Sequence, residues 1–411
     1  MAKTSSETAQ AVKAPFLKAY HELFDSDDLW AAARKLGVVT RERKVDVPAL
    51  VEAAVLAMSG LPGTQTTIFA NYLQLMGEAI APSSFYGRFT VPFAGLMADV
   101  SGRAIEAVRA LAPEDRENEE VAALLRHFTD VQITDSTCKL LQKLAQDWAP
   151  STSPERPASF KLHAVISLKD RLPLLSSISH HSAHHDSPEL DESAISKGAL
   201  FLGDLGYIDQ ERLVRLKRRD VHVVMRLKKS QDPCIHRIRV GKGSKSACRG
   251  ESLDKALGIG MLDFDKGRLD VDVVITTSVD GQPTREIFRV VGIAGDEPGE
   301  DWYYLTTVPP EILSVDDVGL AYTLRWDIEL LWKHLKTGAG LSAIRAWRPA
   351  AVLALVHAKI TAVALARAAG TRCQAVHEGP RHGSARHRAL TQSLTPHDPR
   401  LANAWPGHRY R

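Results

Sequence analysis

The chain has 411 residues, which is enough for two or three domains with sizeable cores. Hydrophobic residues make up 44% and charged residues 25%, a composition that excludes a largely disordered protein. The formal net charge of +3 is too small to indicate a nucleic-acid-binding protein by itself. The charge is unevenly distributed, however, because residues 210–250 contain thirteen Lys and Arg against three Asp and Glu. This bunching favours a polyanionic partner.

Three features bear on the compartment. The cysteines form no C-x-x-C pair and lie far apart, at Cys138, Cys234, Cys248 and Cys373. This argues against a zinc ribbon or a disulfide framework and fits a reducing compartment. The N-terminus has no apolar h-region, so no secretory signal is expected. The most apolar run, 350–370, is interrupted by His357, Lys359 and Arg367 and is interpreted as a core helix rather than a membrane span. We therefore expect a cytoplasmic, nucleoid-associated protein that does not bind a membrane.

Residues 1–125 are predicted to form a mostly helical N-terminal domain, because apolar residues recur there at helical spacing between Pro and Gly. The pair "TTIFANYLQLM" and "SSFYGRFTVPFAGLM" allows two interpretations. It could be a helix-turn-helix that places Ser84, Tyr86 and Arg88 near a DNA groove, which would make this domain bind DNA ends. It could equally be two packed core helices, and the sequence leaves both open.

Residues 126–229 change to short β-rich runs bounded by polar turns, in "FTDVQITDSTC", "FKLHAVISLK", "LPLLSSISHH", "GALFLGDLGYID" and "VHVVMRLKK". Between them, "QERLVRLKRRD" is predicted to be helical. A further helix is predicted with Ser187 as its N-cap and Pro188 at its first position. This order predicts an α/β fold with a mixed sheet covered by helices.

The rest of the chain divides into three parts. Residues 230–318 are predicted to be a β-rich insertion, with a turn at Asp280-Gly281. Residues 319–370 are predicted to form closing helices of the core. Residues 371–411 are rich in His, Arg and Pro with little periodicity, which predicts a poorly ordered basic tail.

The stretch "YTLRWDIELLWKHLKT", residues 322–337, is predicted to be one helix. Its residues Tyr322, Arg325, Glu329 and Lys336 project within a wedge of roughly 60° on a helical wheel. Considered alone, this pattern fits a charged surface face with Arg325 and Glu329 as an ion pair four residues apart.

Two further acids change this interpretation. Asp135 ends the strand-like run in "VQITDST", and Asp204 ends another in "LFLGDLGYID". Carboxylates at the ends of adjacent strands can converge, and Glu329 would make a third. Three carboxylates that hold two Mg²⁺ ions are a known way to cleave phosphodiesters. We therefore predict that these acids form an active site, with the basic segment between the second and third.

"ITDSTC", "GDLGYID" and "YTLRWDIELLWKHLK" resemble the three acidic motifs of bacterial insertion-sequence transposases of the DDE type. The third matches the subgroup signature Y-x2-R-x3-E-x6-K at all four positions. The resemblance covers about residues 128–365. It implies a catalytic domain with an RNase H-like fold, interrupted by a β-rich insertion before the helix that bears the glutamate.

The resemblance also implies roles for individual residues. Asp135, Asp204 and Glu329 would be catalytic and would bind two Mg²⁺ ions, for which Mn²⁺ substitutes. Tyr322, Arg325 and Lys336 would contact phosphates of the element end. The partners would be double-stranded DNA, both element ends and target, bound by a homodimer. From the basic segment, further DNA contacts are predicted at Arg218, Arg219, Lys228, Lys229, Lys242 and Lys245.

Two alternatives to a transposase remain open on the sequence: an inactive remnant that binds DNA without cleaving it, and an RNase H-like nuclease that does not transpose. The histidine cluster at His180, His181, His184 and His185 is interpreted as a polar loop rather than a zinc or nickel site, because no cysteine accompanies it.

Overall fold

The computed structural model describes residues 5–39, 45–59, 63–78, 80–111, 119–151, 158–169, 172–179, 186–227, 231–295, 300–333 and 345–377. Contacts divide the chain into two units, Met1–Ala369 and Gly370–Arg411, and the fold described below is that of the first. The histidine cluster at 180–185 and the tail from residue 378 onward lie outside the described residues.

The N-terminal region is helical, as predicted. Its helices are α1 (Ser5–Leu23), α2 (Ser26–Lys35), α3 (Val47–Ser59), α4 (Gln65–Met76), α5 (Pro82–Tyr86), α6 (Val91–Leu111) and α7 (Glu119–Leu124). α5 has five residues, which is short for a recognition helix. Phe85 in α5 is fully buried, with its ring centroid 4.8 Å from that of Phe69 and 5.5 Å from that of Tyr72. This packing favours two core helices over a helix-turn-helix.

A mixed nine-stranded sheet forms among the described residues, in the order β3-β2-β1-β4-β5-β11-β10-β9-β6. Its strands are β1 (Val131–Leu140), β2 (Ser159–Ser167), β3 (Leu172–Ser179), β4 (Leu200–Gly203), β5 (His222–Arg226), β6 (Cys234–Val240), β9 (Arg268–Val279), β10 (Gln282–Ile293) and β11 (Trp302–Thr306). β4 pairs in parallel with both β1 and β5, and all other neighbours are antiparallel. β7 (Lys242–Gly243) and β8 (Leu262–Asp263) form a separate short pair.

The segment predicted as an insertion continues this sheet. β11 pairs with β5 through Leu305 and Met225, so that β10, β9 and β6 extend the sheet beyond the parallel strands. The alternation in the sequence indicated strands here but not the strand against which they would pair.

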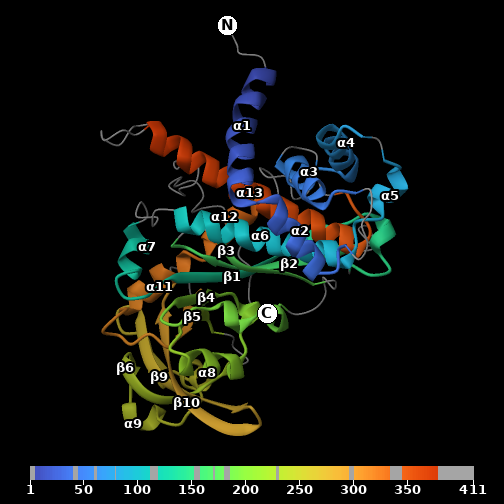
Figure 1. Cartoon of the computed structure of the whole chain (residues 1–411). Coiled ribbons are helices and arrows are strands. Elements are labelled where there is room, and N and C mark those ends of the chain that lie inside the picture. Colours follow the sequence, from blue (N-terminus) through green and yellow to red (C-terminus); the bar gives the residue numbers. More distant parts are fainter. Residues whose placement is uncertain are drawn as a thin grey trace. The chain divides into compact units, whose positions relative to one another are not determined.

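Helices cover both faces of the sheet, and the side chains alternate between two cores. On one face, Val131 and Ile133 of β1 join the core formed with α3, α6, α11 (Val315–Thr323), α12 (Trp326–Lys333) and α13 (Pro349–His377). We call this the α12 face; α6 and α12 pack on β3 and β1 (Figure 1). On the other face, Val223 and Met225 of β5 join the core that includes α8 (Gln210–Arg218), α9 (Lys245–Cys248) and α10 (Leu253–Gly258).

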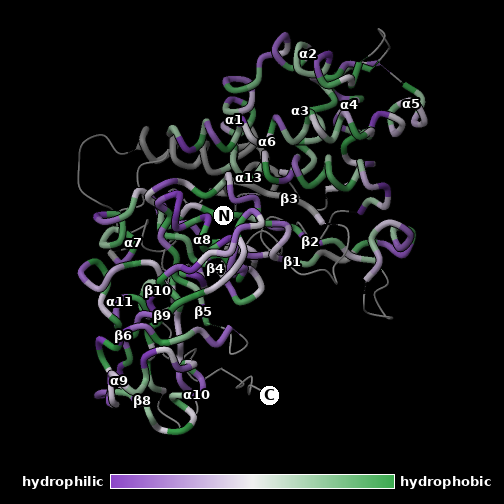
Figure 2. The backbone as a smooth tube through the Cα atoms, turned by 90° about the horizontal axis from the view of Figure 1, so that it is seen from below, coloured by the Kyte–Doolittle hydropathy of each residue, from purple (hydrophilic) through white to green (hydrophobic). Residues whose placement is uncertain are grey.

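α13 contains the apolar run that was interpreted as a core helix. Residues Pro349–Ala366 have the length and apolar composition of a membrane span, and 61% of this segment is buried inside the described structure. Its polar interruptions have partners: His357 Nδ1 lies 3.0 Å from Ser101 Oγ, and Lys359 donates to the Met58 carbonyl. Figure 2 shows hydrophobic and hydrophilic residues interspersed along most helices and strands, α13 included. The burial supports the core-helix interpretation.

The helix predicted to begin at Ser187 is instead a short 3₁₀ turn, η2 (Ser187–Glu189), with Asp186 at its N-cap position. The chain turns again at η3 (Glu192–Ala194), where the Asp191 carboxylate accepts a hydrogen bond from the Ser193 amide at 2.9 Å. This second cap ends the first turn before a helix can extend. The other 3₁₀ turns are η1 (Lys143–Ala145) and η4 (Leu205–Tyr207).

Candidate active site

Asp135 and Asp204 lie side by side on neighbouring parallel strands. Thr134 of β1 is in register with Gly203 of β4, and each aspartate is the next residue along its strand. Because side chains alternate, Asp135 is on the same face as Ile133, which belongs to the core of the α12 face. The strand register thus brings the two acids together, although only Asp204 follows the end of its strand, because β1 continues past Asp135 to Leu140 in its pairing with β2.

The predicted single helix over 322–337 is wrong in one respect, because the chain breaks it between α11 and α12. The amides of Leu324, Arg325 and Asp327 each donate to the carbonyl three residues earlier, at 3.2, 3.1 and 3.0 Å. Such bonds tighten a helix into a 3₁₀ turn. Tyr322 consequently lies in the last turn of α11, while Glu329 belongs to α12, which packs on β1.

Arg325 links the two sides of this break. Its Nη2 donates to Glu329 Oε1 at 2.9 Å, and its guanidinium carbon lies 5.9 Å from the centroid of the Tyr322 ring. The Arg325 side chain is 14% exposed. Three buried polar atoms here have no hydrogen-bond partner in the described structure: Tyr322 Oη, Arg325 Nε and Trp332 Nε1. Orphaned donors of this kind call for a ligand or water.

The electrostatics place the three predicted acids in one neighbourhood. The pKa of the Asp135 carboxyl is raised to about 6. Burial contributes most to this rise and the charges of Asp204 and Glu329 add to it, while the Ser136 amide and Arg325 act in the opposite direction. Burial disfavours the charged form of Arg325, yet Tyr322, Asp204 and Glu329 together raise its pKa. Arg325 is thus the cation that compensates this carboxylate cluster.

These residues fit a divalent metal in kind, since Mg²⁺ prefers hard carboxylate oxygens and the cluster carries a surplus of negative charge. They are not assembled as a metal site in this conformation: within the described ranges, no group of three or more His, Cys, Asp and Glu is close enough to hold an ion. The ion pair with Arg325 occupies Glu329 at 2.9 Å.

Behind the aspartates lies a polar network that the sequence analysis did not assign. Tyr207, three residues after Asp204, is buried, and its hydroxyl forms hydrogen bonds with the side chains of Ser136 and Thr134, the residues on either side of Asp135. Burial and the charges of Asp186 and Asp135 raise the pKa of this phenol. The network ties η4 to β1, and the signal for it was the tyrosine of "GDLGYID".

The network continues through His163. Its Nε2 lies 2.8 Å from Ser179 Oγ, and its Nδ1 lies 3.5 Å from Tyr207 Oη. Burial lowers the pKa of His163. Lys161 Nζ donates to Asp186 Oδ1 at 2.9 Å at the edge of the same network. A neutral imidazole here suits a hydrogen-bonding, positioning role.

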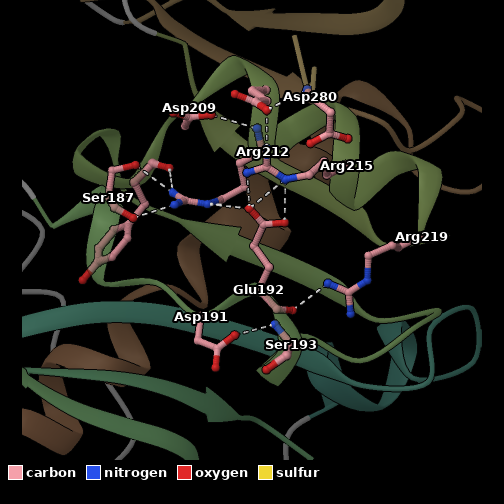
Figure 3. A network of polar contacts seen from close by, with 11 residues as sticks. Ser187, Asp191, Glu192, Ser193, Asp209, Arg212, Arg215, Arg219 and Asp280 are labelled. Atoms are coloured by element: carbon pink, nitrogen blue, oxygen red, sulfur yellow. Dashed lines mark hydrogen bonds and ion pairs between the residues drawn. The ribbon is translucent and has the colours of Figure 1, made fainter. Parts of the chain in front are cut away.

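Part of the basic segment is engaged within the protein. Figure 3 shows Glu192 between Arg212 and Arg215: its Oε1 accepts from Arg212 Nε at 3.2 Å and from Arg215 Nη2 at 2.6 Å. Arg219 donates to the carbonyls of Glu192 and Ile195 at 2.7 and 3.0 Å. These contacts clamp the η2–η3 segment onto α8 and occupy much of the donor capacity of Arg219.

Of the other predicted DNA contacts, the structure describes three. Arg218 has a half-exposed side chain, 3.7 Å from Glu286. Lys242 and Lys245 are exposed in the β7–α9 region. Lys228, Lys229 and Lys336 lie outside the described residues.

Comparison with known proteins decides the family. The family model described as "Transposase DDE domain" matches residues 126–365. The chain belongs to the DDE transposase family. The matched range contains all three acids and supports a transposase, the coarse function predicted from the motifs.

Other comparisons add little. The search of curated proteins finds no match. Among solved structures, the piggyBac transposase synaptic complex with hairpin DNA, determined by cryo-EM, covers 96% of this chain and 86% of its own, at 9% identity and a TM-score of 0.45. That similarity is too low to indicate a shared fold, so the family membership rests on the sequence match.

Proposed function

We propose that this DDE transposase is the enzyme of a bacterial insertion sequence. It binds the ends of its element as double-stranded DNA, hydrolyses a phosphodiester there, and joins the freed end to target DNA. The family match over residues 126–365 and the Y-x2-R-x3-E-x6-K signature support this finer assignment. The mixed sheet with acids on adjacent parallel strands is consistent with an RNase H-like core.

Asp135, Asp204 and Glu329 are the residues that would hold two Mg²⁺ ions, with Mn²⁺ as a substitute. Bound there, the ions would activate the attacking oxygen and stabilise the leaving oxygen. The protein contributes by fixing Asp135 within β1 beside Asp204 at the end of β4, through the register of β1 with β4 and the Tyr207 network. Preorganised positioning of this kind is what phosphoryl transfer requires of a protein.

The proposed reaction has two steps that balance without a further reactant. In the first, a water oxygen bonds to phosphorus and the phosphorus–O3′ bond breaks, which leaves a 3′-hydroxyl on the element and a 5′-phosphate on the flank. In the second, that 3′-oxygen bonds to a phosphorus of the target strand. The target's own phosphorus–oxygen bond breaks, and its oxygen takes up the proton.

Tyr322 and Arg325 are proposed to hold a DNA phosphate beside the acids. Their orphaned Oη and Nε atoms are free donors in a buried setting, and a guanidinium can grip phosphate oxygens in a bidentate way. A phosphate that takes over Arg325 would also release Glu329 from its ion pair. Lys336 completes the signature in the sequence as a further phosphate contact.

The observation that carries the proposal is that Asp135 and Asp204 follow paired residues of the parallel strands β1 and β4, while α12, which carries Glu329, packs on β1. The test is cleavage of duplexes taken from the DNA that flanks the gene, with Mg²⁺ and purified protein. The variants Asp135→Asn, Asp204→Asn and Glu329→Gln should each lose cleavage while still binding DNA. Asp327→Asn, on the same helix but outside the signature, should cleave like the parent.

Other results would select other functions. Cleavage without joining, and without preference for the inverted repeats, would indicate a nuclease that does not transpose. Binding with no cleavage in either Mg²⁺ or Mn²⁺ would indicate an inactive remnant. A homodimer in the DNA complex and a location at the nucleoid are further parts of the proposal, to be checked by the mass of the complex and by imaging of a tagged chain.

A further inference from the structure

A cavity of about 500 Å³ opens at the outer edge of the sheet, far along it from the acids. β6 is the edge strand there, and α9 and the loop after β11 complete the wall. We call it the basic cavity, because its charged lining residues are Arg237, Arg239, Lys245, Arg249 and Glu311.

The charges of the basic cavity are largely uncompensated. Arg237, Lys245 and Arg249 are exposed and have no ion-pair partner within the described part of the chain. Arg239 is the exception, because it forms an ion pair with Asp272. A single acid, Glu311, lines the cavity against these cations. Bunched cations around an open hollow indicate an anionic ligand.

Local structure explains why the arginines point into this space. β6 has register shifts on both sides of Arg237 and Ile238 against β9. Ile235 and Ile238 are both buried in the core opposite the α12 face, so Arg237 and Arg239, which flank Ile238, lie on the α12 face. Arg239 confirms this placement through its partner Asp272, because the neighbouring Val271 and Val273 of β9 belong to that opposite core.

The basic cavity therefore opens at the β6 edge of the sheet, and its Arg237 and Arg239 lie on the face that carries the acids. Six strand-to-strand steps lead from β1 to β6. At about 4.8 Å for each step the separation is about 29 Å. A duplex rises about 3.4 Å per base pair, so this corresponds to about eight base pairs.

We propose that the basic cavity is a second DNA-contact site, which binds backbone phosphates about eight base pairs from the phosphate that is cleaved. The inference rests on the proposed function, since the acids define the cleaved position. The basic cavity is open and its cations are spread around it, which suits consecutive phosphates of a DNA backbone. A single small anion would instead be held by one enclosed pair of guanidinium groups. Contacts of this type set register and affinity without reading sequence.

The first test measures binding of a fluorescein-labelled 30-base-pair duplex of mixed sequence by anisotropy, across a range of salt concentrations. For Arg237→Ala/Arg249→Ala, the slope of log binding constant against log salt should be shallower by about 1.8, which is two phosphate contacts. Glu311→Gln should bind about two- to fivefold more tightly, because the one opposing charge is gone.

The matched control removes two charges from the same region but outside the basic cavity. Arg285 and Lys255 are both exposed, on β10 and α10. Arg285→Ala/Lys255→Ala should leave the slope within about 0.3 of the parent. Because Arg237 and Arg249 are exposed, their replacement should leave the thermal unfolding temperature unchanged, which shows that the fold is retained.

The second test uses cleavage of flanking-DNA duplexes of graded length in Mg²⁺. The Arg237→Ala/Arg249→Ala variant should cleave long duplexes less efficiently at low DNA concentration. It should match the parent when fewer than about six base pairs extend beyond the cleaved position. An unchanged salt slope, or a loss that persists on the shortest duplexes, would overturn the inference. If the parent cleaves no duplex while the slope still changes, the proposed function fails and the basic cavity stands.

Discussion

Replacing Asp135 with Asn should stabilise the metal-free protein while abolishing cleavage. The Asp135 carboxyl is held between two other acids in a partly buried position, and its pKa is raised from 3.8 to about 6. Above pH 6 the native state must carry an ionised carboxylate that its surroundings disfavour. Asn keeps the shape and removes the charge, so the variant lacks this cost.

The magnitude follows from the pKa. A rise of about two units at about 1.36 kcal/mol each gives about 3 kcal/mol, which is an upper limit because solvent screens the exposed part of the carboxylate. The direction follows from proton binding: below pH 3.8 the group is protonated in both native and unfolded states, so it costs nothing. The cost appears as the pH rises from 3.8 and is complete above about 6.

The assay is urea unfolding followed by tryptophan fluorescence, in EDTA, at pH 7.5 and pH 4.5. The free energy of unfolding of Asp135→Asn should exceed that of the parent at pH 7.5 by about 1–3 kcal/mol, and by clearly less at pH 4.5. Asp327→Asn removes an acid from the first turn of α12 that lies outside the signature, so it serves as the control and should show no such pH-dependent gain. Equal gains at both pH values, or a loss at pH 7.5, would refute the electrostatic reasoning.

Three further predictions concern the scaffold. Arg289→Met should cost up to about 3–5 kcal/mol in urea unfolding, because Arg289 donates to both carboxylate oxygens of buried Asp270 at 3.0 and 2.9 Å and its loss leaves that charge with Arg239 alone, at 3.6 Å. A double variant that also carries Asp270→Leu should recover most of this loss, and no recovery would contradict the prediction. Burial lowers the pKa of His357 to about 4, so stability should fall by roughly 3 kcal/mol between pH 6.5 and pH 4, and His357→Gln should flatten that pH dependence of the unfolding temperature. Glu192→Gln should lower the free energy of unfolding by about 1–3 kcal/mol and speed proteolysis near η3, because Arg212 and Arg215 lose their shared carboxylate. Unchanged proteolysis would indicate that these ion pairs do not hold the η2–η3 segment on α8.

The two aspartates could be predicted from the sequence because each comes directly after a run of residues with strand character. Asp135 and Asp204 follow apolar runs directly, and parallel register then makes them neighbours. The helical N-terminal region and the core helix near residue 355 were likewise visible in the spacing of apolar residues.

Other features depend on partners distant in the chain, which a pattern cannot name. The alternation within 268–293 indicated strands, but the pairing of β11 with β5 decides that they extend the main sheet. The charges of Arg212 and Arg219 suggested DNA, yet Glu192 and backbone carbonyls engage them. The break at Leu324 arises from i→i−3 hydrogen bonds that helical periodicity does not reveal.

The most direct measurement is Mg²⁺-dependent cleavage of a duplex from the element's flank by the parent and by Asp135→Asn, Asp204→Asn and Glu329→Gln, with DNA binding recorded for each. We expect that only the parent cleaves, leaving a 3′-hydroxyl on the element strand, and that all four proteins bind the duplex. Cleavage by any of the three variants at the rate of the parent would contradict the claim that these carboxylates form the active site.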